Sequence, residues 1–442
     1  MNARINQLYD VMLQHGEDGT ARFYAGLRAR GISPFPNAAR HEQNLYAPNP
    51  VIVGSDIIQT MTRDANSFCA ALRDQVADAA SLLDRAPQHI QQHYASSELA
   101  AQLIADHRRA HPLVCLDAFL VATATGIQPA YLEWQTVGTY VTMGMLMLAA
   151  AGEAWPEISQ YSHGTAWPNL TPDGLAAHLQ TLYTQGIADD PRTGVIVDYR
   201  PELCATRREF YAIQDLTGGV EQGMGIIDPR EILHMAGGFQ YRRNGTLVPI
   251  RRVYSRLVYS DVLQLEQEAT ADEVATIRRF YQTGDQHTWI SHLLHFFYGS
   301  KADFPAFWQA GLSPCIPETQ VVSPELVAEW RERVGAGPLV GYVQKPLNAQ
   351  SGRDVILHPM VAQLANGAIL QREIMPLATH RTLWGTRTPE VRIMATPNEN
   401  GELITGLIYN RIKSQDVFLS NAGSLARDGI PGTGEGFGIV VE

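Results

Sequence analysis

Lysine is almost absent from this chain of 442 residues, in which Lys301, Lys345 and Lys413 are the only lysines among 34 basic residues. A sequence that uses arginine nearly everywhere keeps lysine where a compact ammonium group on a flexible stem is needed. Acidic residues outnumber basic ones, and the net charge is -11. The chain lacks the basic face that nonspecific binding to nucleic acid or to an anionic membrane requires, so neither partner is expected and any phosphate binding must be local.

Cysteine and long hydrophobic runs are also scarce. The four cysteines lie far apart, at Cys69, Cys115, Cys204 and Cys315. This spacing favours neither a zinc site nor a disulfide framework, so we expect reduced thiols in a core. The most apolar run, residues 137–151, is shorter than a bilayer span and contains Gly and Thr, which predicts a buried helix. Residues 1–7 lack the apolar segment of a secretory signal, and a cytoplasmic protein is expected.

The hydrophobic spacing predicts a mixture of helices and strands. Apolar side chains recur at three- and four-residue intervals over residues 63–85, which predicts an amphipathic helix that ends before Pro87. A second helix is expected at residues 289–308. Short apolar runs bounded by turns predict strands at 113–121, 130–134, 247–258, 340–345, 369–374, 390–396 and 403–411. The glycine-rich tail from Gly423 is expected to be a mobile flap or a loose terminus.

Lys345 ends the apolar strand Gly-Tyr-Val-Gln-Lys-Pro and precedes a turn of small residues that contains Ser351 and Gly352. A strand that delivers an ammonium group into a cleft, beside backbone N–H groups that can close over phosphate oxygens, suits a polyphosphate. In isolation, the same pattern also fits an exposed lysine before a surface hairpin. Lys301, in the turn Phe-Tyr-Gly-Ser-Lys, supplies a second ammonium group.

The strand that contains Gln371 and Glu373, Ile-Leu-Gln-Arg-Glu-Ile-Met-Pro, is suited to an adenine ring. Its backbone edges can pair with the donor and acceptor of the ring, and its apolar side chains can flank the ring faces. Further on, Arg411 ends the strand Gly-Leu-Ile-Tyr-Asn-Arg.

In this order, the segments around Lys301, Lys345, Gln371 and Arg411 resemble the ATP-grasp superfamily, and within it the branch typified by glutathionylspermidine synthase. The resemblance covers residues 111–135 and about 245–421 at the level of motifs. It implies an ATP-grasp nucleotide fold in which the two lysines bind ATP phosphates. The turn with Ser351 and Gly352 would form the phosphate lid, the strand with Gln371 and Glu373 would line the adenine pocket, and Arg411 would contact the transferring phosphate.

In that branch the Mg²⁺ ligands come from an early pattern, R-x-D-x-x, a turn, then L-E-x-N, which Asp117, Glu133 and Gln135 resemble. Side chains at 133 and 135 point to one face of a strand, so three oxygens can converge on Mg²⁺ if Asp117 lies on a neighbouring strand. The chain departs from the pattern twice, because Gln135 replaces an asparagine and Cys115 replaces an arginine. The second change removes a cation that should help to hold the substrate carboxylate or its phosphate. Alternatively, Asp117 and Glu133 are strand-end carboxylates that face solvent.

Arg256 ends a cationic strand, which also contains Arg251 and Arg252, and resembles the family's Val-Tyr-x-Arg segment. A guanidinium at this position could bind a substrate carboxylate bidentately, with a salt-bridged surface arginine as the alternative. Three nearby histidines fall on different faces of the expected helix, so no metal site is predicted at His287, His292 and His295.

These observations predict an α/β (α+β) chain with a helical N-terminal region at 1–105, a substrate and metal-ligand domain at 106–265 and an ATP-grasp nucleotide-binding region at 266–442. The function that the resemblance implies is an ATP-dependent carboxylate–amine ligase, with ATP and Mg²⁺ as cofactors and a small carboxylate and a small amine as substrates. Two alternatives stay open: a phosphotransferase of the same fold, and a catalytically silent nucleotide-binding regulatory protein. A monomer and a homodimer are equally consistent with the sequence.

Overall fold

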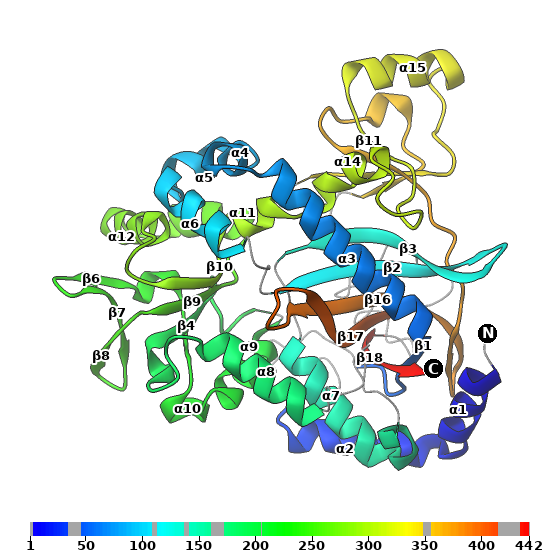
Figure 1. Cartoon of the computed structure of the whole chain (residues 1–442), viewed down its shortest axis with the longest axis horizontal. Helices are drawn as coiled ribbons and strands as arrows, with labels where there is room; N and C mark the ends of the chain where they lie inside the picture. Colours follow the sequence, from blue (N-terminus) through cyan, green and yellow to red (C-terminus); the bar gives the residue numbers. More distant parts are fainter. Residues whose placement is uncertain are drawn as a thin grey trace.

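The computed structural model describes residues 3–33, 46–107, 113–136, 141–160, 172–204, 206–347, 355–413 and 434–441. Within these ranges the chain is a mixed α/β protein in which helices surround a central sheet, with a smaller sheet to either side (Figure 1). None of the helices in the described ranges is both long enough and apolar enough to cross a membrane.

The central sheet has the strand order β1-β18-β17-β16-β2-β3, and β15 pairs with β16. β1 and β18 pair in parallel, and the other neighbours are antiparallel. The strands are β1 (Val51–Gly54), β2 (Val114–Thr123), β3 (Gly126–Gln135), β15 (His380–Thr382), β16 (Gly385–Pro397), β17 (Leu403–Lys413) and β18 (Gly434–Val441). The sheet therefore takes strands from all three segments expected from the sequence, and the domain boundaries at 105 and 265 stay a prediction.

Side chains alternate between two cores on the faces of this sheet. Leu116 of β2, with Ile393 and Ile408 of the neighbouring strands, packs against α3, which crosses one face (Figure 1). Cys115, Met394 and Tyr409 belong to the other core, which the helices α1, α2 and α7 cover. Because alternate residues of a strand share a face, residues 117, 392 and 411 point toward the α7 side.

Two further sheets are formed by strands between residues 194 and 291. A four-stranded parallel sheet has the order β10-β9-β4-β5, and a three-stranded antiparallel sheet has the order β6-β7-β8. Their strands are β4 (Gly194–Val197), β5 (Gly225–Ile227), β6 (Leu233–Met235), β7 (Gly238–Arg243), β8 (Thr246–Pro249), β9 (Arg252–Ser255) and β10 (Thr288–Ser291). One core joins the parallel sheet to the helices α6, α11 and α12.

A small antiparallel sheet, with the order β11-β14-β12-β13, lies on the opposite side of the molecule. Its strands are β11 (Thr319–Val321), β12 (Tyr342–Lys345), β13 (Ile356–Leu357) and β14 (Ile369–Arg372). Trp330 of α15 packs with Tyr342 and Leu370 on one face of this sheet. Packing against α15 therefore holds β12, the strand that carries Lys345, in place.

The α-helices connect and cover these sheets. They are α1 (Ala3–Gln14), α2 (Gly16–Ala29), α3 (Ser55–Gln75), α4 (Ala79–Leu83), α5 (Gln88–His93), α6 (Ser97–His107), α7 (Val141–Ala154), α8 (Pro172–Thr184), α9 (Arg207–Leu216), α10 (Gly219–Gln222), α11 (Tyr259–Glu268), α12 (Ala271–Gln282), α13 (His295–Tyr298), α14 (Phe304–Gln309) and α15 (Pro324–Val334). Short 3₁₀ turns are η2 (Pro156–Gln160), η3 (Pro191–Thr193), η4 (Pro229–Glu231), η5 (Lys301–Asp303) and η6 (Val361–Gln363).

Most of the strands expected from the sequence are confirmed, and so is the buried helix α7. The helix expected at 289–308 is wrong, because Thr288–Ser291 forms β10 in the parallel sheet and only short helical turns follow it. The helix expected at 63–85 is divided, since Asp78 caps the N-terminus of α4 through the backbone N–H of Ser81. The loose tail is partly wrong: residues 414–433 lie outside the described ranges, but Gly434–Val441 is strand β18.

Candidate functional site

A row of charged side chains crosses three strands of the central sheet. Arg392 of β16 lies opposite Asp117 of β2, and Asp117 lies opposite Glu133 of β3. Glu390, two residues before Arg392 in β16 and on the same face, lies opposite Arg411 of β17. Strand pairing alone therefore brings three carboxylates and two guanidinium groups to one face of the sheet.

The contact between Arg392 and Asp117 is a bidentate, buried ion pair. Arg392 Nε donates to Asp117 Oδ1 at 2.5 Å, and Arg392 Nη2 donates to Oδ2. Both side chains are almost fully buried, with 3% and 1% exposed. The same guanidinium lies 3.5 Å from Glu133 Oε1, on a side chain that is 29% exposed. Arg392 therefore contacts the carboxylates of both Asp117 and Glu133.

A second ion pair lies next to the first. Arg411 Nη1 donates to Glu390 Oε1 at 3.0 Å, and the Glu390 side chain is only 6% exposed. A buried carboxylate of this kind fixes the orientation of the guanidinium that it binds. Arg411 is the more exposed partner, so its guanidinium stands at the edge of the buried row.

The buried charges shift the pKa values of the two carboxylates in opposite directions. Burial raises the pKa of Asp117 to about 7, with Arg392 opposing the rise. Burial also acts against the charged form of Glu133, but the charges of Arg392, Arg411 and Lys301 outweigh it, and the pKa of Glu133 lies below its ordinary value. Glu133 is therefore ionised at neutral pH.

Lys345 connects the small antiparallel sheet to the central sheet. Its Nζ donates to the backbone oxygen of Leu132 in β3 at 2.9 Å and to Gln371 Oε1 at 2.6 Å. Gln371 is buried in β14 and donates to Thr319 Oγ1 at 3.2 Å. The structure thus brings Lys345 and Gln371 together and places both beside the strand of Glu133.

Lys301 approaches Glu133 from a turn that is locked to the end of β3. Thr136 Oγ1 donates to the backbone oxygens of His295 at 2.6 Å and Gly299 at 3.2 Å. A Cβ atom on Gly299 would lie 2.3 Å from Thr136 Cγ2, so only glycine allows this approach. Burial lowers the pKa of Lys301, and the charge of Glu133 opposes the shift.

Two further expectations concern Glu373 and the phosphate lid. Glu373 directly follows β14, and its Oε2 lies 2.8 Å from His358 Nε2. Its place in an adenine pocket stays a prediction. The lid residues Ser351 and Gly352 lie outside the described ranges.

Arg256 follows β9 of the parallel sheet. It is half-buried, lies over the ring of Tyr254 at 5.7 Å and interacts electrostatically with Asp198. Burial raises the pKa of Asp198 to about 7, and Arg256 opposes this shift. Tyr254 lies within electrostatic range of both Arg256 and Cys115 of β2.

The three expected magnesium ligands do not form a ready set of oxygen donors. Both oxygens of Asp117 accept hydrogen bonds from Arg392, and Gln135 donates its amide Nε2 to Glu133 Oε1 at 2.5 Å. Within the ranges given above, no group of three or more His, Cys, Asp or Glu side chains is arranged to hold a metal ion. The donor set does not fit the hard cation that the resemblance implies.

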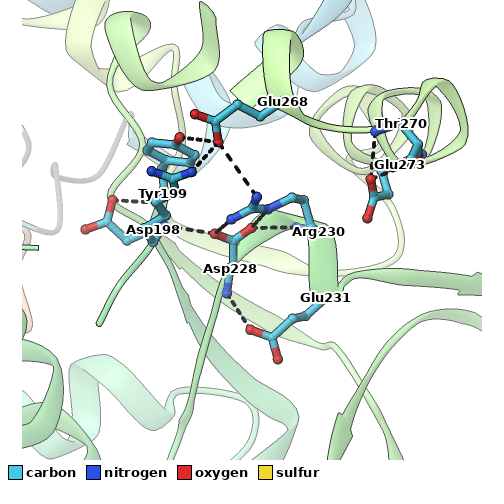
Figure 2. Close-up of polar contacts among 9 residues, drawn as sticks. Asp198, Tyr199, Asp228, Arg230, Glu231, Glu268, Thr270 and Glu273 are labelled. Atoms are coloured by element: carbon cyan, nitrogen blue, oxygen red, sulfur yellow. Dashed lines mark hydrogen bonds and ion pairs between the residues drawn. The ribbon is translucent and has the colours of Figure 1, made fainter. Parts of the chain in front are cut away.

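A separate polar cluster lies at the carboxyl ends of β4 and β5 (Figure 2). Arg230 donates to both oxygens of Asp228, at 2.7 and 2.8 Å, while Tyr199 and Arg200 both donate to Glu268 Oε2. Asp228 also begins η4 by accepting from the Arg230 backbone N–H. The contacts satisfy one another and join loops of the parallel sheet to the end of α11, which is a structural role.

Sequence reasoning missed Glu390 and Arg392 as members of the site. Both lie in the strand Glu-Val-Arg-Ile-Met-Ala-Thr, where charged residues alternate with apolar ones. Alternation of that kind in an otherwise buried strand predicts a charged row on one face, and this pattern could have identified them.

No protein-family model matches the sequence. No curated protein matches it either. Among solved structures, the chain is similar to a glutathione synthetase-like effector from Globodera pallida in its apo form, with a TM-score of 0.52 and 10% sequence identity over 99% of this chain and 97% of that one. Because the identity is low, the likeness concerns the fold alone.

Proposed function

We propose that this chain is an ATP-dependent carboxylate–amine ligase that forms an amide bond through an acylphosphate. The observation that carries the proposal is the junction of two sheets at β3, where Lys345 binds the backbone of Leu132 and Lys301 interacts with Glu133. Ammonium and guanidinium groups from distant parts of the chain surround one row of carboxylates, which suits a triphosphate and a substrate acid. The fold shared with a glutathione synthetase-like protein supports the same class of reaction.

The reaction needs two steps, because a carboxylate does not react with an amine at neutral pH. First, a carboxylate oxygen of the substrate attacks the γ-phosphorus of ATP, and the bond to ADP breaks. Then the amine attacks the acyl carbon, phosphate leaves, and the amine loses a proton. The protein contributes mainly by holding the groups in position and neutralising charge.

The residues of the site take distinct parts in this proposal. Lys345 and Lys301 neutralise the ATP phosphates, and Gln371 orients Lys345 at the entrance of the adenine pocket. Arg411, oriented by Glu390, stabilises the transferring phosphoryl group. Arg256 binds or orients the substrate carboxylate.

Two further expected elements of the nucleotide site enter the proposal differently. The turn with Ser351 and Gly352 would exclude water from the acylphosphate, and Glu373 would border the adenine pocket. Magnesium bound to ATP would supply phosphate charge neutralisation. We assign no step to a metal held by Asp117, Glu133 and Gln135, because their donors are already engaged.

A catalytically silent nucleotide-binding protein is the second candidate. Cys115 stands where the resembled family has an arginine, and its thiol donates to Met394 Sδ at 3.2 Å. Asp117 is also fully committed to Arg392. A phosphotransferase that stops at a phosphorylated product is the remaining alternative.

Release of ADP and phosphate from ATP, measured against a panel of amino acids, other small acids and amines, separates these candidates. A ligase releases phosphate only when both an acid and an amine are present. A stable phosphorylated product would identify a phosphotransferase, and ATP binding without turnover on any pair would favour the silent protein.

The nucleotide site itself is tested by K345M, in which an apolar side chain of similar length replaces the ammonium group. We expect ATP affinity, measured by calorimetry, to fall by at least about tenfold, because a buried cation beside the phosphates is lost. R333A is the matched control, since Arg333 is an exposed cation of α15 that pairs with Glu329 and lies over the ring of Trp330 in the same part of the molecule. Equal ATP affinity in K345M and wild type would rule out the proposed phosphate site.

A further inference from the structure

In the charged row, the Arg392 guanidinium lies between two carboxylates that would otherwise need another cation to offset their charge. Arg392, Asp117 and Glu133 face one another in register across β16, β2 and β3. Two carboxylates that lie near each other on one face of a sheet repel each other unless a positive charge lies between them. Arg392 is that charge, since it binds both oxygens of Asp117 and lies 3.5 Å from Glu133.

The position of this guanidinium is fixed by the fold. Arg392 is 3% exposed and is anchored in a strand that pairs on both sides, with β2 and with β17. A divalent cation at the same two carboxylates would have to approach within about 2–2.5 Å of the oxygens that the guanidinium already binds. Coordination and the ion pair therefore exclude each other.

We propose that the Arg392 guanidinium takes the place of a divalent cation at Asp117 and Glu133, so that the protein binds no Mg²⁺ or Mn²⁺ there, and that removing this one charge creates a divalent cation site. The new site would consist of the two carboxylates, with the Gln135 amide next to Glu133 able to rotate its oxygen toward the ion. This inference concerns the carboxylates alone and is independent of the proposed ligase activity.

Titration with Mn²⁺, followed by the loss of the free-ion signal in electron paramagnetic resonance, tests the proposal in the full chain without nucleotide. Wild type should bind no ion at this position. R392M, which keeps the length of the side chain without its charge, should bind one Mn²⁺ with an affinity at least about a hundredfold above any Mn²⁺ binding detected in wild type. R392K, which keeps a cation, should resemble wild type.

A second measurement is the effect of Mn²⁺ on the melting temperature of the variants. R392M leaves Asp117 buried and unpaired, so Mn²⁺ should raise its melting temperature but should not raise that of R392K. The double variant D117N–R392M should lose the bound Mn²⁺, which identifies the ligand.

The proposal is overturned if wild type binds one Mn²⁺ that is lost in E133Q, or if folded R392M binds no more Mn²⁺ than wild type. If R392M does not fold even with Mn²⁺, the wild-type and E133Q titrations still decide, because absence of such an ion supports the proposal. None of these outcomes depends on K345M, so failure of the ligase proposal and failure of this one are distinguishable.

Discussion

At the scale of single residues, three histidines are buried in the uncharged form. Burial lowers the pKa of His287, His292 and His380 from 6.5 to about 3. His287 stacks on Phe280 with ring centroids 4.5 Å apart. Unfolding exposes these rings to water, where they bind protons at much higher pH than they do in the folded chain.

We therefore expect the free energy of unfolding to fall as pH is lowered from 6.5 toward 3. Each histidine with a depressed pKa contributes up to about 1.4 kcal/mol per pH unit in this window, since only the unfolded state takes up the proton. Denaturant unfolding between pH 7 and pH 5 should show a smaller loss in H287F than in wild type. H234Q, at an exposed position, is the control and should follow wild type. An unchanged slope in H287F would contradict neutral burial of His287.

At the scale of elements, the N-terminus of α7 depends on a carboxylate from another helix. Glu209 of α9 is 1% exposed and accepts hydrogen bonds from the backbone N–H groups of Thr142 at 3.0 Å and Met143 at 2.8 Å. A negative charge at this end of a helix satisfies donors that have no partner within the helix and also favours its dipole. α9 thereby fixes α7 against the central sheet.

E209A should lower the free energy of unfolding by about 2–5 kcal/mol, because two buried N–H groups lose their acceptor. Guanidinium denaturation monitored by circular dichroism measures this loss. E329A removes an exposed carboxylate that pairs with Arg333, and it should cost less than about 1 kcal/mol. Similar values for the two variants would show that Glu209 does not hold α7.

The strands show how much local pattern predicts. The β2–β3 pair was expected from two apolar runs around a turn, because a hairpin is specified by contiguous residues. Residues 288–291 were expected to be helical, since a short apolar run has no period that distinguishes a buried strand from a helix. Only the neighbouring parallel strand β9 decides the matter.

At the scale of the whole molecule, the last strand closes the central sheet. β18 lies between β17 and β1, which are separated by about 350 positions in the sequence. Phe437 and Ile439 of β18 are fully buried in the same core as α2 and α7. The strand therefore joins elements from both ends of the described chain.

Deletion of residues 434–442 should abolish cooperative unfolding and soluble expression, because β1 loses its partner strand, β17 loses one of its two partners, and both expose apolar edges. Calorimetry of any protein recovered measures the transition. I439V is the mild control and should cost about 0.5–1.5 kcal/mol. A truncated chain with a normal transition would mean that β18 is dispensable.

Some residues of the candidate site can be identified from local sequence patterns, whereas others depend on contacts between distant parts of the chain. The scarcity of lysine and the Lys345 strand pointed to residues that the fold does bring beside Glu133. Arg392 received no role, because its contact with Asp117 joins positions 275 residues apart. Glu373 was grouped with Gln371 because both belong to one expected strand, whereas its contact with His358 joins residues from different elements.

The sequence by itself determined the mixture of helices and strands, the alternation that puts charges on one strand face, and the small number of lysine ammonium groups. These features depend on residues close together in the chain, and short-range spacing encodes them. Only the tertiary structure decided which strands became neighbours, and therefore that Arg392 lies between Asp117 and Glu133. The physical reason is that pairing between distant strands is selected by the burial of whole faces, a property that no single segment contains.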